Sequence, residues 1–154
     1  MLLGQYFVVL TQKDRLSVPS RFRGELGSKI VLTKWVEGCL LMLSLEKLNE
    51  LIRNVLGTKE LSLFVVRETQ RFLLGSAFEI ELDSQGRFVL PKMLKEYANI
   101  TSDVAFVGLG DRVEIWDKIS WQKKEEDLQK NAMNLMIELS NAKYQKDLSR
   151  TSSG

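Results

Sequence analysis

Short apolar runs rich in β-branched and aromatic residues recur along the chain and are separated by turn-forming segments. Such runs predict strands, because these side chains suit a pleated surface. The first half contains YFVVL (6–10), KIVLTK (29–34) and GCLLML (38–43). The second half contains, in the same order, FEIEL (78–82), DVAFVG (103–108) and DRVEIW (111–116). The pattern therefore predicts two similar units in a fold that is mainly β with helices (α+β).

A nine-residue segment occurs in both halves in related form, as TQKDRLSVP at 11–19 and as DSQGRFVLP at 83–91. Arg15 aligns with Arg87, and the closing prolines align at the same offset, since 87 − 15 and 91 − 19 are both 72. Each copy contains a turn, a short strand-like stretch and a proline. A proline can open a helix because its missing N–H is not needed in the first turn. The repeat predicts two pseudo-symmetric halves.

Helices are expected between the strand pairs. Short helices should follow the two prolines and end at Gly27 and Asn99, which tolerate the left-handed conformation that closes a helix. Ser44 is a candidate N-cap for a longer helix with leucines at helical spacing. The segment 61–75 lacks strict alternation, and with Ser62 as its candidate cap it predicts a further helix that joins the halves.

These elements predict five segments along the chain. They are a first repeat at 1–57, a helical link at 58–75, a second repeat at 76–121, a C-terminal helical extension at 122–148 and a frayed tail at 149–154. The extension is charge-rich with a broken apolar stripe, which is typical of a helix packed on one side. No apolar run approaches the length that a bilayer demands, so neither a transmembrane helix nor a signal peptide is expected.

Composition argues against most kinds of enzyme. The 154 residues include no histidine, which removes the commonest general base and every His-containing metal site,. The sequence also lacks a Gly-rich phosphate loop and a CxxC pair, so no catalytic residue, metal, cofactor or small-molecule substrate is expected,. Cys39 lies in an apolar run and is expected to be a buried, inert thiol. An enzyme resting on Glu79, Glu81 and Asp83 is an alternative, although two glutamates at period-two spacing usually line a solvated strand face.

The repeated turns have the chemistry of fixed loops that present an arginine. In the second copy, Asp83 can accept hydrogen bonds from main-chain N–H groups, and Gly86 supplies a positive φ, so that Arg87 is aimed. In the first copy, Thr11 replaces the carboxylate with a hydroxyl, and Asp14 stands at the glycine position. Asp tolerates the left-handed region better than most residues, but this turn is expected to be less rigid.

Basic and amide side chains gather around both turns, although the net charge is only +2. The candidate DNA-contacting residues are Lys13, Arg15, Arg21, Arg23, Gln85, Arg87 and Lys92. A guanidinium group can grip phosphate, or guanine O6 and N7 together. The alternative to DNA contact is that Asp83 and Arg87 form a local ion pair with no role in binding. The turn occurs twice together with its basic neighbours, which favours a protein that binds nucleic acid through both copies.

The paired loops, the link RETQRFLLG (67–75) and the strand segments CLLML and VGLGDRVEIW resemble the MraZ family of bacterial transcriptional regulators. The resemblance runs from Met1 to about Trp121. The family's hallmark is a D-x-x-x-R motif in each half, with R-x-x-x-P following. Asp83 to Arg87 matches this motif fully, whereas the first copy lacks its Asp and has an acidic residue at the usual Gly position.

The resemblance implies a pseudo-two-fold, swapped-hairpin double-split β-barrel of the AbrB/SpoVT type with flanking helices. It also implies a ring-like homo-oligomer in the cytoplasm and at the nucleoid. Such a ring would bind repeated promoter boxes in double-stranded DNA and repress the division and cell-wall gene cluster. A ring would present many copies of the Arg15 and Arg87 turns, so a weakly basic subunit could still build a strongly basic rim. A structural protein that self-assembles without reading DNA is the alternative.

Overall fold

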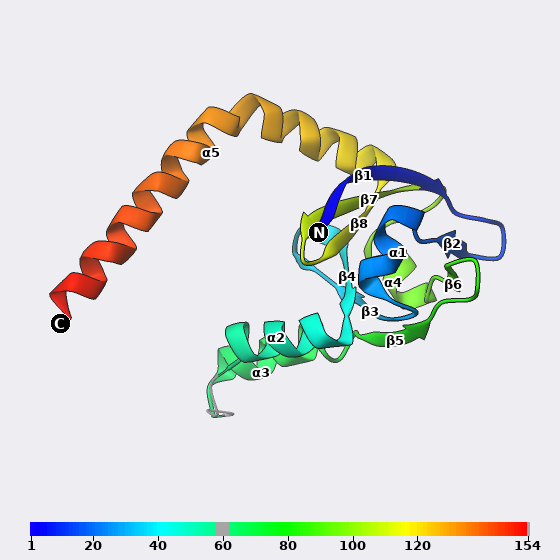
Figure 1. Ribbon diagram of the computed structural model, residues 1–154, viewed down its shortest axis with the longest axis horizontal. Helices are drawn as coiled ribbons and strands as arrows, with labels where there is room; N and C mark the ends of the chain where they lie inside the picture. The colour runs from blue at the N-terminus through cyan, green and yellow to red at the C-terminus, as the bar shows by residue number, and fades with distance from the viewer. Residues whose placement is uncertain (58–61, 154) are drawn as a thin grey trace. The chain divides into compact units, whose positions relative to one another are not determined.

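The computed structural model describes residues 1–57 and 62–153. The chain divides into two units, Met1–Lys118 and Ile119–Gly154. In the first unit, the first repeat supplies β1 (Leu2–Val9), β2 (Arg15–Ser17), α1 (Ser20–Leu26), β3 (Lys29–Lys34), the 3-10 turn η1 (Val36–Gly38), β4 (Leu40–Ser44) and α2 (Leu45–Val55). After α3 (Phe64–Leu73), the second repeat supplies β5 (Phe78–Glu81), β6 (Arg87–Val89), α4 (Lys92–Tyr97), β7 (Asp103–Gly110) and β8 (Val113–Asp117). Figure 1 shows this succession of elements.

The strands of the first unit form a six-stranded antiparallel sheet in the order β1-β7-β8-β4-β3-β5 and a two-stranded sheet of β2 and β6. The opening strand of each repeat pairs with the other repeat: β1 lies along β7, and β5 lies along β3. The order of the large sheet is therefore unchanged when the two repeats exchange places. A mixed fold with a large antiparallel sheet and helices is confirmed.

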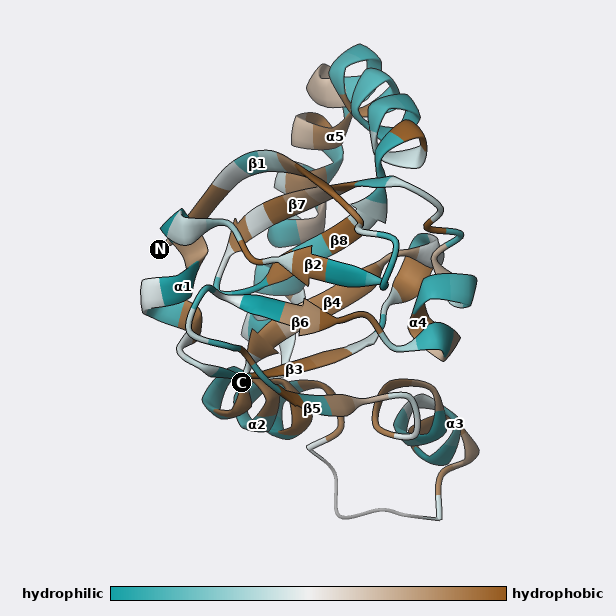
Figure 2. Ribbon diagram, turned by 90° about the vertical axis from the view of Figure 1, so that its right-hand side faces the viewer, coloured by the Kyte–Doolittle hydropathy of each residue, from teal (hydrophilic) through white to brown (hydrophobic). Residues whose placement is uncertain are grey.

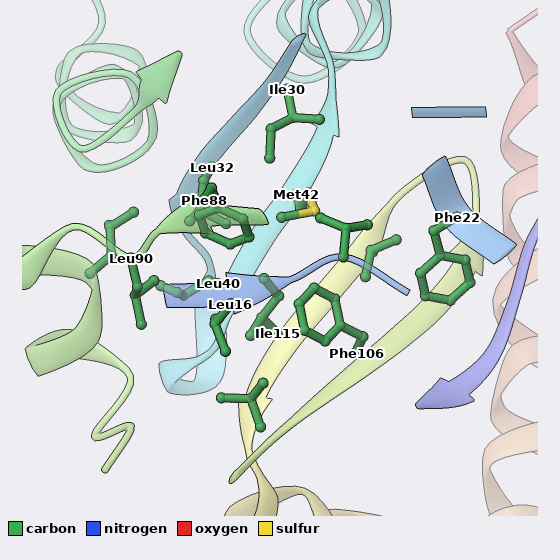
Figure 3. Close-up of a cluster of buried hydrophobic side chains, with 14 of the residues drawn as sticks. Leu16, Phe22, Ile30, Leu32, Leu40, Met42, Phe88, Leu90, Phe106 and Ile115 are labelled. Atoms are coloured by element: carbon green, nitrogen blue, oxygen red, sulfur yellow. The ribbon is translucent and has the colours of Figure 1, made fainter. Parts of the chain in front are cut away.

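One apolar core holds both repeats together. Leu16 of β2 lies directly opposite Phe88 of β6, and both side chains are buried. The helices contribute the corresponding pair Phe22 and Leu94, which are also buried. Figure 3 shows Leu16 and Phe88 in this cluster together with side chains of the large sheet. Because burying one such side chain contributes about 1.5–3 kcal/mol, this core fixes the small sheet against the large one.

The helix ends follow local signals in the sequence. Pro19 and Pro91 directly precede α1 and α4. Ser44 caps α2, because its hydroxyl accepts a hydrogen bond from a backbone N–H three residues later at 3.2 Å,. Gly27 follows α1 with φ of 78°, and Asn99 lies just beyond α4 with φ of 52°. The expected capping and closing residues are therefore in place on these three helices.

The N-terminus of the linking helix, α3, differs from the one that the sequence predicts. It begins at Phe64 after Leu63, and no side chain caps it, so the expected capping role of Ser62 is wrong. Ser62 instead offers its backbone carbonyl to an Arg67 guanidinium nitrogen at 2.6 Å. Residues 58–61, where the link was expected to begin, lie outside the described residues.

Cys39 is fully buried next to β4, as its apolar surroundings predict. In the second unit, α5 (Lys118–Ser152) continues through most of the segment expected to be frayed. Its apolar side chains from Leu128 to Leu148 are largely exposed. Within the part of the chain that the structure describes, no helix combines the length and the apolar character needed to cross a bilayer.

Candidate nucleic-acid interface

The turn between β5 and β6 is held by the side chain of Asp83. One carboxylate oxygen accepts hydrogen bonds from the backbone N–H groups of Gln85, at 2.9 Å, and Arg87, at 2.8 Å. The other oxygen accepts from the Arg87 Nε at 2.8 Å. Gly86 completes the turn with φ of 75°. The carboxylate therefore fixes both the backbone of the turn and the guanidinium group that leaves it.

The protonation of Asp83 follows from these contacts. Hydrogen bonding by the backbone N–H of Arg87 lowers the pKa of the Asp83 carboxyl below its ordinary value of 3.8, with further help from the Arg87 side chain and the Gln85 N–H. Donors aimed at a carboxylate favour its charged form. Asp83 is therefore ionised at neutral pH and remains a full acceptor for the arginine.

The turn between β1 and β2 adopts the same backbone pattern with different residues. Thr11 N donates to Arg15 O at 3.1 Å, and Asp14 N donates to Thr11 O at 3.0 Å. The same two bonds occur in the second turn at residues 72 positions later. The Thr11 hydroxyl accepts from Arg15 N at 3.1 Å, as the Asp83 carboxylate does from Arg87 N. Asp14 has φ of 56°, so it takes the left-handed conformation that Gly86 takes in the second turn. The departures in sequence leave the path of the first turn unchanged.

Each turn is also bonded to the other repeat. Val18 N donates to Gly86 O at 2.9 Å, and Leu90 N donates to Asp14 O at 2.7 Å. Val18 and Leu90 occupy equivalent places in the two repeats. The backbone of each turn is thus bonded to the residue just after β2 or β6 of the other repeat, so the two turns are linked to each other.

A basic residue from each short helix packs on the turn of the opposite repeat. The Arg23 Nε donates to Val18 O at 2.8 Å, and its side chain covers Gly86 so closely that a Cβ there would lie 2.2 Å from the Nε. The Lys95 Nζ lies 2.8 Å from the Asp14 carboxylate. Arg23, considered for DNA contact, therefore has a bond within the fold.

Lys95 was not among the predicted site residues. Its tie to Asp14 spans 81 positions, so local sequence gives no sign of the contact. One signal could have indicated it: Arg23 and Lys95 occupy the same place in the two repeats, at the offset that relates Arg15 to Arg87. A position that is basic in both repeats is a candidate for the same structural role in both.

The register of the small sheet places both arginines on one face. Arg15 lies opposite Val89, and Arg87 lies opposite Ser17, on either side of the buried central pair. Because side chains alternate along a strand, residues next to that buried pair all face outward. Figure 2 shows β2 and β6 side by side on the near side of the first unit. Arg15 and Arg87 therefore project from the same surface, on diagonally related positions of adjacent strands.

The other predicted contact residues, apart from Arg23, lie in the two turns and at the starts of α1 and α4. Lys13 and Gln85 are exposed in the two turns, and Arg21 is exposed in the first turn of α1. Lys92 is largely exposed in α4, with its Nζ 3.8 Å from a Glu96 carboxylate. Together with the two strand arginines they make a surface, here called the arginine face, that carries several positive charges.

Two acidic side chains considered for other chemistry lie on the same strand. Glu79 and Glu81 are exposed on β5, as expected for a solvated strand face. Across residues 1–57 and 62–153, no three Cys, Asp or Glu side chains come together in a way that could hold a metal ion.

The fold and the arginine face define a small mixed α/β protein with two internally related basic turns. The sequence model of the MraZ protein family, which its description calls antitoxin-like, matches residues 73–140. A protein of Thermoanaerobacter pseudethanolicus named Transcriptional regulator MraZ is 44% identical over 123 residues, which cover 80% of this chain and 85% of the relative. A protein of the same name from Caldicellulosiruptor saccharolyticus is 39% identical over 131 residues, with 82% and 88% covered. The chain belongs to the MraZ family.

Proposed function

We propose that the protein is a sequence-specific, DNA-binding transcriptional regulator that contacts DNA through the arginine face. The observation that carries the proposal is the projection of Arg15 and Arg87 from one face of a two-stranded sheet, each beside a backbone-held turn. Arginine is suited to this task, since its planar group can bind guanine through two hydrogen bonds or bind phosphate. The relatives named as transcriptional regulators support the same function.

In this proposal the surrounding residues attach the protein to the DNA backbone. Lys13, Arg21 and Lys92 contact phosphates, and Gln85 offers an amide to a phosphate or a base edge. Contacts of this kind set orientation and supply salt-dependent affinity, whereas base-edge contacts supply specificity. Arg23 contributes mainly by covering the second turn, because its Nε is already bonded to Val18 O.

The finer features that the family resemblance implies belong to the same proposal. The two sheets make a swapped-hairpin double-split barrel, for which the exchange of β1 and β5 between the repeats is the support. Subunits assemble into a ring that aligns many arginine faces on repeated promoter boxes and represses the division and cell-wall gene cluster. The exposed Phe64 and Val65 of α3 provide apolar surface for subunit contact,. The protein acts in the cytoplasm at the nucleoid and catalyses no reaction.

Selection of bound fragments from random double-stranded DNA tests the proposal. The expected result is a short enriched box, repeated at about 10 base pairs so that successive boxes face one side of the duplex. Arg15→Ala and Arg87→Ala should each weaken retention of that DNA without changing the size of the assembly in solution. Arg53→Ala, which removes an exposed arginine of α2, is the matched control and should bind as the unaltered protein does.

A structural protein that only self-assembles is the second candidate, and the exposed apolar residues of α3 favour it. A salt titration separates the two. DNA binding should weaken with a log-log slope of roughly −0.9 per phosphate contact, whereas apolar assembly should barely respond. If no box is enriched and both arginine variants behave as the unaltered protein does, the regulator proposal is wrong.

A further inference from the structure

We propose that the two arginines make different contacts with DNA: Arg87 recognises a base edge, whereas Arg15 mainly contacts a phosphate. This inference rests on the proposed function, and it names which of the two arginines determines specificity. It follows from a difference in how the two guanidinium groups are held, on turns whose backbones are alike.

The backbones of the turns cannot be the source of a difference. In both turns the first residue donates its N–H to the carbonyl of the arginine and accepts the N–H of the residue before the arginine. Both turns also accept a backbone N–H from the residue that follows the strand of the opposite repeat. Both take a positive φ at the residue before the arginine. The backbone positions of the two arginines are therefore equivalent. Any difference between them comes from their side chains and the contacts that these make.

Arg87 leaves its turn in a fixed direction. The Asp83 carboxylate holds the Nε at 2.8 Å, while its other oxygen is anchored by two backbone N–H groups. The carboxylate is thereby a rigid support for the guanidinium plane. Since the Nε is engaged, the two terminal nitrogens form the edge left to a ligand. Two parallel donors of this kind match O6 and N7 of guanine, and fixing them in advance lowers the entropy lost on binding.

Arg15 lacks such a support. Thr11 has one side-chain oxygen, and it accepts from the backbone N–H of Arg15. The nearby acid of the same turn, Asp14, is engaged by Lys95 at 2.8 Å. Among the described residues, the guanidinium of Arg15 has no hydrogen bond or ion pair. An arginine that can still turn suits a phosphate, which accepts donors from many directions, better than a base edge, which demands one.

The test compares binding of purified variants to the selected box and to a scrambled duplex of the same length at several salt concentrations. Arg87→Ala should reduce the preference for the box by about 5- to 150-fold, the range expected for one lost bidentate base contact. Arg87→Lys should lose a similar preference while it keeps the salt slope, because the charge remains. Arg15→Ala should weaken binding to both duplexes by the same factor and lower the salt slope by about one.

A variant that should increase the preference for the box tests the inference without relying on loss of binding. Thr11→Asp restores the missing carboxylate and should increase the preference for the box, because it gives Arg15 a support like that of Arg87. Thr11→Asn is its control, since it keeps an acceptor oxygen without the charge and should change the preference less. Thermal unfolding and assembly size, measured for each variant, verify that the fold is intact.

The outcomes separate this inference from the function on which it rests. If the unaltered protein shows no preference for any box, the proposed function fails. If it prefers the box but Arg15→Ala and Arg87→Ala abolish that preference equally, the protein is a DNA reader whose two turns do the same work, and the inference is wrong. Equal losses with no gain from Thr11→Asp would contradict it most directly.

Discussion

Lys95 places its Nζ 2.8 Å from the carboxylate of Asp14, so a helix of the second repeat holds the turn of the first. This contact explains how an acidic residue occupies the position where the second turn has Gly86. Asp14 takes the left-handed backbone conformation, and its charge has a partner. At the equivalent place Arg23 covers the glycine. Two different pairs of residues thus occupy equivalent positions in the two repeats.

The Asp14–Lys95 pair should contribute little to global stability. Both side chains are about a third exposed, and such ion pairs are typically worth about 0.2–1 kcal/mol,. A double-mutant cycle with Asp14→Asn and Lys95→Met, followed by urea unfolding, should give a coupling energy in that range. The matched control is the cycle for Lys92 and Glu96, which are more exposed and 3.8 Å apart. Coupling there should be smaller, and equal coupling in the two cycles would argue against a specific role for Lys95.

Gly86→Ala should destabilise the protein. The new Cβ would lie 2.2 Å from the Arg23 Nε, and φ of 75° is unfavourable for alanine by roughly 1–2 kcal/mol,. Arg23 must then move and release Val18 O, which adds to the cost. Gly24→Ala is the control, because a Cβ in that helical position meets nothing within 4 Å and should stabilise by about 0.5–1 kcal/mol,. Urea unfolding of both variants measures the contrast, and a neutral Gly86→Ala would contradict it.

Phe88→Ala should be among the most costly substitutions in the small sheet. Its side chain is buried directly opposite Leu16, and truncation of a buried phenylalanine costs about 3–5 kcal/mol,. Val89→Ala, one position along the same strand and exposed, should change stability by no more than about 0.5 kcal/mol,. The free energy of unfolding from urea titration gives both values. Similar losses for the two variants would place Phe88 outside the core.

Stability in acid should depend on Asp83. Its pKa is lower in the folded protein than its ordinary value of 3.8, because the Arg87 backbone N–H, the Arg87 side chain and the Gln85 N–H favour the ionised form. A depressed carboxyl pKa contributes stability that is present above the unfolded value and is lost as the pH falls through the folded one. Asp83→Asn should therefore make unfolding less dependent on pH below about 4. NMR titration of the Asp83 carboxyl checks the direction, and an ordinary or raised value would contradict it.

The sequence indicates much of the candidate site because the turn chemistry is local. Asp83, Gly86 and Arg87 lie within five positions, and their spacing alone predicts a carboxylate that accepts backbone donors beside a residue with positive φ,. The 72-residue repeat then predicts a second turn, even where Thr11 and Asp14 replace the usual residues. Short-range hydrogen bonds depend on residues that are close in sequence, so they can be inferred from the sequence.

The cross-repeat contacts could not be inferred in this way. The tie between Asp14 and Lys95 and the cover of Gly86 by Arg23 depend on which strands pair, and an apolar strand pattern does not specify its partner,. The same limit applies to β1, whose composition indicates a strand but not that it lies along β7 of the other repeat. Local composition also placed the cap of α3 wrongly at Ser62.

The exchange of β1 and β5 makes each repeat an incomplete domain by itself. A chain ending after the first repeat would leave the edge of β3 without its partner strand, and a second copy of that fragment could supply the missing strand,. Joining two such copies covalently removes the bimolecular step, so the two arginine turns come together at any protein concentration. Because the two repeats lie in one chain, they can also differ in sequence, so that one turn has a carboxylate where the other has a hydroxyl.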